Sequence, residues 1–368
     1  MWESRGRVVE VGSLAELDAR LARGARSLEG WRVASVDLTD RGDVLAACDV
    51  AGATFLGCRF ALGVEAVLEA RGALVFPELA ASPVDPYRSR LYSPADLYDA
   101  PAYRDSFDAR AYAWFRTTED DDALLARALH DHAVDRALDA WTAGRRLVGV
   151  MGGHAVRRGS PAYASAARLG RTLGDAHVVA TGGGPGAMEA ANLGAYLAAE
   201  HESALDRALA DLAAVPGFRP SVDAWVGAAR GVASRHEGSE SLGIPTWHYG
   251  HEPTNPFATT VAKYFHNPTR EAILLQLCEA GIVFLPGAAG TVQEVFQDAC
   301  ENYYADPSSV APMILLGRRY WTEELPVWPL LQALGRGRPM EQHLHLADSV
   351  EEVRDLLGAS PPGTVSSP

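Results

Sequence analysis

A glycine-rich turn at residues 182–186 is the first place where this chain could do chemistry. It follows the apolar stretch 177–180 and precedes a helix-forming stretch, so the segment is predicted as a buried strand, a turn and a helix. Glycines leave the backbone bare, and the N–H groups of such a turn can converge on an anion at a helix start. The pattern predicts a phosphate-binding turn that uses Gly183, Gly184 and Gly186, although glycines also form tight turns that bind nothing.

A second turn of the same kind follows the apolar stretch 282–285. Here Gly287 and Gly290 lead into a predicted helix, and Thr291 can offer both a hydroxyl and a backbone N–H at its start. Glu294 lies about one helical turn further on and therefore points to the same end of the helix. Because turns at the carboxyl ends of parallel strands line one crevice, the two turns can hold one phosphorylated ligand between them.

Strands and helices are predicted to alternate throughout residues 147–357. This alternation predicts an α/β fold with a doubly wound, Rossmann-like parallel sheet and helices on both faces. The first strand, 147–151, ends in a third glycine turn that carries His154, which either contacts the ligand or is only a turn residue. A predicted helix that opens at 267–272 places Arg270 one element before the second turn, which favours a functional role over a solvated surface charge.

The chain is predicted to have three parts. Residues 1–142 form a smaller N-terminal α/β extension, with a long ordered loop at 77–108, and end in a long amphipathic helix that connects the extension to the core. Residues 143–358 form the Rossmann-like core domain, which carries both glycine turns and includes a predicted helix at 323–334 near its end. Residues 359–368 are too rich in proline and serine to fold and are expected to be a disordered tail.

Composition excludes several classes of protein. The net charge of −14 argues against a nucleic-acid-binding protein. No apolar run reaches the ~18 residues of a membrane span, and the N-terminus lacks a signal-peptide core, so a cytoplasmic protein without membrane contact is expected. His130 and His132 lie on different helix faces, and no metal site is expected. Four cysteines without metal-type spacing are expected to be buried thiols: Cys48, Cys58, Cys278 and Cys300.

The two glycine turns together resemble the motifs of the LOG (Lonely Guy) family of nucleoside 5'-monophosphate phosphoribohydrolases, which are often labelled lysine decarboxylases. The family patterns are roughly GGGxGxMEAxxxGA and PGGxGTxxE. Residues 182–195 match the first closely, whereas in the second, at 286–294, Ala288 stands in place of a glycine. The resemblance covers roughly residues 147–357. The Glu-Pro-x-Asn-Pro stretch at 252–256 resembles the larger bacterial branch of the family, the nucleotide 5'-monophosphate nucleosidases of broader specificity.

This resemblance implies hydrolysis of the N-glycosidic bond of a nucleoside 5'-monophosphate, which releases a free base and ribose 5-phosphate. It implies two catalytic residues. Glu294 would stabilise the oxocarbenium-like ribosyl carbon with its carboxylate, and Arg270 would polarise the leaving base or clamp the phosphate. Gly287, Gly290 and Thr291 would bind the phosphate together with the glycines of the first turn.

The resemblance also implies a set of secondary roles. Glu189, His154 and Asn255 are assigned to binding of the ribose or the base. Glu271 stands where the family usually has a lysine, a change that bears on substrate choice. The stretch 201–235 is a helical insertion relative to the shortest relatives. A homodimer or larger homo-oligomer is implied, with neither a cofactor nor a metal.

Three other functions are compatible with parts of this sequence. A dinucleotide-binding oxidoreductase is disfavoured, because the helical insertion occupies the place of the acidic residue that such proteins need. A lysine decarboxylase is disfavoured, because Lys263 is the only lysine in the chain and lies in no cofactor motif. A non-catalytic nucleotide or cofactor carrier of the same fold stays open: Ala288 favours it, whereas the intact Glu294 and Arg270 disfavour it.

Overall fold

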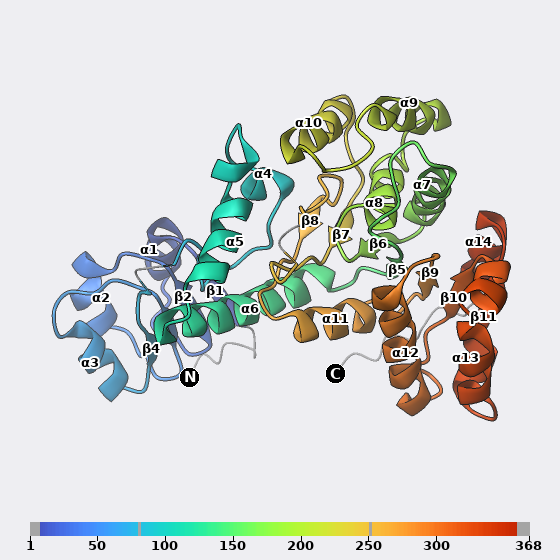
Figure 1. Cartoon of the computed structure of the whole chain (residues 1–368). Helices are drawn as coiled ribbons and strands as arrows, with labels where there is room; N and C mark the ends of the chain where they lie inside the picture. Colours follow the sequence, from blue (N-terminus) through green and yellow to red (C-terminus); the bar gives the residue numbers. More distant parts are fainter. Residues whose placement is uncertain (1–7, 80–81, 250–251, 359–368) are drawn as a thin grey trace. The chain divides into compact units, whose positions relative to one another are not determined.

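The computed structural model describes residues 8–79, 82–249 and 252–358, and the described chain forms two compact units (Figure 1). The first unit extends to Leu91 and includes Trp114–Leu138, and the second comprises Tyr92–Ala113 and the chain from Asp139 onward. This division differs in two respects from the predicted boundary after residue 142, because Tyr92–Ala113 groups with the second unit and the first unit ends at Leu138. The predicted disordered tail lies outside the described residues.

The second unit contains a seven-stranded sheet in the order β11-β10-β9-β5-β6-β7-β8, in which every neighbouring pair is parallel. Strand β5 lies in the middle. The chain builds outward to one side from β6 to β8 and then returns to build β9 to β11 on the other side, so the topological switch point lies between β5 and β9. The strands are β5 (Leu147–Met151), β6 (Val178–Thr181), β7 (Ser241–Gly243), β8 (Thr260–Val261), β9 (Ile282–Phe284), β10 (Met313–Leu316) and β11 (Leu344–Ala347).

Helices cover both faces of this sheet, which confirms the predicted fold class (Figure 1). On one face lie α7 (Pro161–Gly174), α8 (Ala187–Tyr196) and α14 (Val350–Gly358); on the other lie α11 (Asn267–Gln276), α12 (Ala289–Tyr304) and α13 (Val327–Gly335). Helices α7 and α8 pack very closely, because a Cβ at Gly194 would fall 1.8 Å from the carbonyl oxygen of Ala167. The stretch predicted as a helical insertion forms α9 (Glu202–Ala213) and α10 (Val222–Ala233).

Two predicted elements differ from the structure. The helix predicted at 323–334 begins only at Val327, after a separate π-helical turn at Tyr320–Glu324. Pro326 separates the two, since proline disfavours a helical conformation at the residue before it. The loop predicted at 77–108 contains α4 (Pro94–Leu97), which a reciprocal Ser93–Asp96 capping box initiates, a 3-10 turn and the start of α5 (Phe107–Thr117).

A buried ion pair holds the Tyr92–Ala113 segment within the second unit. The Lys263 ammonium lies 2.6 Å from Asp108 Oδ1 and also donates to Thr254 Oγ1 at 2.9 Å. Trp247 Nε1 donates to the same Asp108 oxygen at 3.0 Å. The only lysine of the chain therefore serves an internal network between segments far apart in sequence, so the place of Tyr92–Ala113 in the second unit could not be predicted from the sequence.

The first unit has its own four-stranded parallel sheet, in the order β1-β2-β3-β4, and its own hydrophobic core. Its elements are β1 (Val9–Val11), α1 (Leu14–Ala22), β2 (Trp31–Ala34), α2 (Gly42–Ala46), β3 (Thr54–Leu56), α3 (Val64–Ala70), β4 (Leu74–Phe76) and the first part of α6 (Asp121–Thr142). The predicted N-terminal α/β extension is thus confirmed. Of the cysteines, Cys48, Cys58 and Cys278 are buried as predicted, but Cys300 is exposed on α12, so that part of the prediction was wrong.

In the described part of the chain, no helix combines the length and the apolar character that a bilayer crossing requires.

Candidate functional site

A cavity of about 550 Å³ opens at the carboxyl edge of the seven-stranded sheet, at the switch point between β5 and β9. Pockets of roughly 300–1,000 Å³ are typical for small-molecule ligands. The turns that follow β5, β6 and β9 all contribute to its wall, as does the loop that follows β7. The lining residues are Gly152, Gly153, His154, Ala155, Val156, Gly182, Gly184, Met188, Pro245, Thr246, Tyr249, Glu252, Arg270, Pro286, Gly287, Ala288, Gly290, Thr291, Glu294 and Tyr320.

The N-terminus of α12 is open to this cavity. Gly287, Gly290 and Thr291 line it as predicted, and no side chain caps the helix start. The first N–H groups of a helix have no intrahelical partner, and the helix dipole favours an anion beside them. A Cβ at Gly287 would lie 2.1 Å from Thr291 Oγ1, so a glycine is needed for that hydroxyl to lie in the turn. Ala288 is exposed and has a φ of −92°, so this position does not require the left-handed conformation that favours glycine.

The first glycine turn is different, because two of its N–H donors, those of Gly183 and Ala187, are used within the protein. Gly183 N–H donates to Thr181 Oγ1 at 3.0 Å, and the first N–H of α8, from Ala187, donates to the carbonyl oxygen of Gly153 at 3.1 Å. Neither Gly183 nor Gly186 lines the cavity, whereas Gly184 does. The assignment of Gly183 and Gly186 to phosphate binding is therefore corrected: they allow a close approach of backbone segments rather than a close approach of ligand.

Arg270 is buried and lines the cavity, and it also holds two segments of the wall together. Its Nη2 donates to the carbonyl oxygen of Gly182 at 3.1 Å, and its Nε donates to that of Ile244. Its Nη1 forms an ion pair with Glu271 at 2.7 Å. A Cβ at Gly182 would lie 2.2 Å from Nη2, so the glycine at this position makes room for the guanidinium. Three of the five N–H donors of Arg270 therefore serve these protein partners.

Glu294 lines the cavity one helical turn after the start of α12, as predicted. Burial raises the pKa of its carboxyl to about 8; Glu271 adds to the increase, and Arg270 opposes it. At pH 7 the carboxyl therefore carries a proton when the cavity holds no ligand. A carboxylic acid of raised pKa in a cleft is a candidate proton donor.

Glu271 supplies the negative charge that faces both Arg270 and Glu294. Its side chain is buried, and its Oε2 has no hydrogen-bond partner within the described structure. The residue that replaces the lysine of the family pattern thus adds to the raised pKa of Glu294, because a neighbouring negative charge disfavours a second one.

Glu189 does not line the cavity, and its assignment to ribose binding is corrected. It is fully buried in an ion pair with Arg158, whose Nε donates to it at 3.0 Å, and Arg158 also donates to the carbonyl oxygen of Trp225. Burial raises the pKa of Glu189, and Arg158 opposes that effect. The pair ties α8 to the turn before α7 and to α10, and so supports the cavity from behind.

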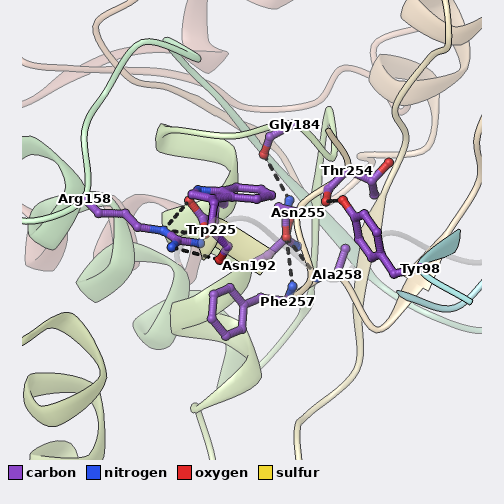
Figure 2. Close-up of polar contacts among 10 residues, drawn as sticks. Tyr98, Arg158, Gly184, Asn192, Trp225, Thr254, Asn255, Phe257 and Ala258 are labelled. Atoms are coloured by element: carbon purple, nitrogen blue, oxygen red, sulfur yellow. Dashed lines mark hydrogen bonds and ion pairs between the residues drawn. The ribbon is translucent and has the colours of Figure 1, made fainter. Parts of the chain in front are cut away.

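Asn255 is likewise a supporting residue rather than a cavity-lining one (Figure 2). Its Nδ2 donates to the carbonyl oxygen of Gly184 at 3.2 Å and to Asn192 Oδ1 at 3.1 Å, while its Oδ1 accepts from the N–H groups of Phe257 and Ala258. Its own N–H donates to the carbonyl oxygen of Gly183. Asn255 therefore fixes the first glycine turn against the loop that follows β7.

Sequence reasoning did not find several residues of the wall. Tyr320, after β10, lines the cavity and donates through its hydroxyl to the carbonyl oxygen of Gly287 at 2.7 Å. Tyr249 and Glu252 come from the loop after β7, and Glu252 Oε1 lies 3.6 Å from His154 Nδ1. His154 lines the cavity, and its contact with a ligand stays a prediction. The Glu-Pro-x-Asn-Pro stretch was the available signal, because it contains Glu252.

Among the described residues, no group of three or more histidine, cysteine, aspartate or glutamate side chains could hold a metal ion.

No protein-family model matches the chain, and no curated protein matches it. Solved structures do match. The molybdenum cofactor binding protein from the phototrophic bacterium Rippkaea orientalis is 18% identical, with a TM-score of 0.37, over 58% of this chain and 96% of that one. The molybdenum cofactor carrier protein from Chlamydomonas reinhardtii is 16% identical, with a TM-score of 0.36, over 58% and 99%. The X-ray structure of TM1055 is 20% identical, with a TM-score of 0.37, over 58% and 99%. At these values the likeness carries no inference about ligand or activity.

Proposed function

We propose that this chain hydrolyses the N-glycosidic bond of a nucleoside 5'-monophosphate and releases a free base and ribose 5-phosphate. The observation that carries the proposal is the geometry of α12. Its uncapped N-terminus and Glu294 line the same cavity one helical turn apart. A phosphate at the helix start would therefore place the attached ribose beside the carboxyl.

Phosphate binding would rest on backbone dipoles and one cation. Gly290 and Thr291 line the cavity at the helix start, where the first N–H groups of a helix have no intrahelical partner. Arg270 adds a positive charge and further N–H donors beyond those that its protein partners use. In a chain with a net charge of −14, this local arrangement is what would attract a dianion.

Glu294 would act twice in one turnover. As the bond between C1' and the base nitrogen breaks, its carboxyl gives its proton to the departing base. The carboxylate that remains opposes the positive charge of the oxocarbenium-like ribosyl carbon. Water then attacks C1' and returns a proton to the carboxylate, so that one water is consumed and the acid is restored. The pKa of about 8 keeps Glu294 protonated at the start of this cycle at neutral pH.

The carrier alternative makes a different prediction about stoichiometry. A hydrolase incubated with a tenfold molar excess of nucleoside 5'-monophosphate releases several equivalents of free base, each matched by one equivalent of ribose 5-phosphate. A carrier binds at most about one equivalent and returns it unchanged. Chromatography of the mixture decides between the two, with AMP, GMP, CMP and UMP as separate probes. We also expect a cytoplasmic protein that forms a homo-oligomer. Analytical ultracentrifugation of the same preparation tests the oligomeric state.

A further inference from the structure

One wall of the cavity is left for the base of the proposed nucleotide. The phosphate and the ribose occupy the side formed by α12, where Thr291 and Glu294 lie. The rest of the lining includes Met188 and two residues of the loop after β7, Tyr249 and Glu252. Tyr249 is 43% exposed, and an aromatic ring at the rim of a cavity suits stacking on a planar base.

Glu252 brings a carboxylate to this wall. Its side chain is only 19% exposed, its Oε1 lies 3.6 Å from His154 Nδ1, and its Oε2 lies 3.7 Å from the place that a Cβ on Gly184 would take. The loop is anchored close by, because Asn255 is fully buried and bonded to Gly183 and Gly184. The carboxylate is thus held against the cavity before a ligand arrives, which lowers the cost of ordering it on binding.

We propose that Glu252 and His154 select guanine, so that the nucleotide taken is a guanosine monophosphate; this rests on the proposed function in that the ligand is a nucleoside 5'-monophosphate. The Watson–Crick edge of guanine presents two adjacent donors, N1–H and the 2-amino group, beside one acceptor, O6. The two oxygens of a carboxylate accept from both donors at once. A histidine N–H can donate to O6, and His154 lies next to Glu252, with its Nδ1 3.6 Å from Glu252 Oε1.

Other bases fit this pair less well. Hypoxanthine keeps N1–H and O6 but lacks the 2-amino group, so one carboxylate oxygen loses its partner. Adenine presents an acceptor at N1, which would face the carboxylate without a hydrogen between them. A hydrogen bond to a charged group contributes enough that each missing donor lowers kcat/KM by about ten- to a hundredfold.

The test compares GMP, IMP and AMP with the full-length protein, by kcat/KM for base release and by Kd from calorimetry. We expect the wild-type protein to favour GMP over IMP by at least about tenfold and AMP to be the poorest of the three. In Glu252→Gln, whose amide offers one acceptor and two donors, the GMP-to-IMP ratio falls to within about threefold. Glu279→Gln, a matched change at an exposed position outside the cavity lining, keeps the wild-type ratio.

A wild-type protein that binds and hydrolyses the three nucleotides alike overturns the guanine proposal and leaves the proposed hydrolysis intact; this comparison needs no variant. A Glu252→Gln variant that keeps the wild-type ratio also overturns it. If none of the nucleotides is hydrolysed, the proposed function fails. The Kd values for GMP and IMP then decide the guanine proposal: GMP bound at least about tenfold more tightly supports it, and equal binding overturns it. Absence of binding by all three overturns both.

Discussion

Replacing Glu294 by glutamine removes one titratable group from the cavity wall and keeps the size of the side chain. If Glu294 donates a proton and then opposes the ribosyl cation, glutamine can do neither. Loss of a well-placed group that stabilises transition-state charge costs about 10²–10³ in kcat. We expect kcat to fall by about a hundredfold or more, with a change in nucleotide Kd of no more than a few-fold, because the phosphate-binding N–H groups are untouched.

Whereas Glu294→Gln should lower kcat, it should raise the free energy of unfolding. The sign of this effect follows from the raised pKa of Glu294. The folded-state pKa of about 8 lies above the unfolded value of 4.5. Between these values the unfolded chain releases the proton and the folded chain retains it, so the wild-type protein loses stability as the pH rises from 4.5 to 8. The full difference corresponds to about 5 kcal/mol at most. Because the side chain is partly open to the cavity, we expect Glu294→Gln to be more stable than the wild-type protein by about 1–2 kcal/mol at pH 8.

Three measurements on Glu294→Gln therefore belong together: kcat, nucleotide Kd, and unfolding free energy at pH 5 and pH 8. The account predicts a slow variant that binds nucleotide and gains stability over the wild-type protein as the pH rises. It also predicts that wild-type kcat/KM falls as the pH rises through about 8, since the free enzyme must carry the proton. A variant with near-normal kcat, or a wild-type kcat/KM that increases through pH 8, would refute the assignment of Glu294 as the acid.

Three further substitutions test the supporting structure. Gly186→Ala introduces a Cβ at φ +77°, 2.5 Å from two backbone carbonyl oxygens, and should lower stability by about 2 kcal/mol or more in chemical denaturation. Glu189→Gln should lower Tm, because Arg158 loses its buried partner, while KM for the nucleotide stays within about twofold; a large rise in KM would restore Glu189 as a ribose ligand. Lys263→Met leaves Asp108 as an unpaired buried charge and should cost about 3–5 kcal/mol; an unchanged unfolding midpoint would show that the pair does not hold its segment.

The fold and the α12 turn could be predicted because their signals are local. Apolar strands separated by helix-length segments indicate a parallel sheet, and a glycine turn before a helix places Thr291 and Glu294 at one end of that helix. The structure agrees in each of these respects.

The role of the glycine turn at 182–186 could not be predicted from the sequence. Its glycines look the same in sequence whether their N–H groups face a ligand or an acceptor within the protein. The partner that decides the matter for Glu189 is Arg158, 31 residues away, and the partner of Asn255 at Gly184 is 71 residues away. Tyr320 reaches the cavity from a third element with no motif of its own. Hydrogen bonds between distant segments therefore separate cavity-lining residues from those that support the cavity.

The most direct test of the proposed function is a comparison of kcat/KM for a nucleoside 5'-monophosphate and for the same nucleoside without its phosphate, by chromatographic detection of free base. GMP and guanosine are the pair of choice. If the open start of α12 binds the phosphate and thereby positions the ribose at Glu294, the nucleotide should be hydrolysed at least about a hundredfold more efficiently, with ribose 5-phosphate formed in equal amount to the base. Equal release of base from GMP and guanosine, or release from neither, would contradict the account.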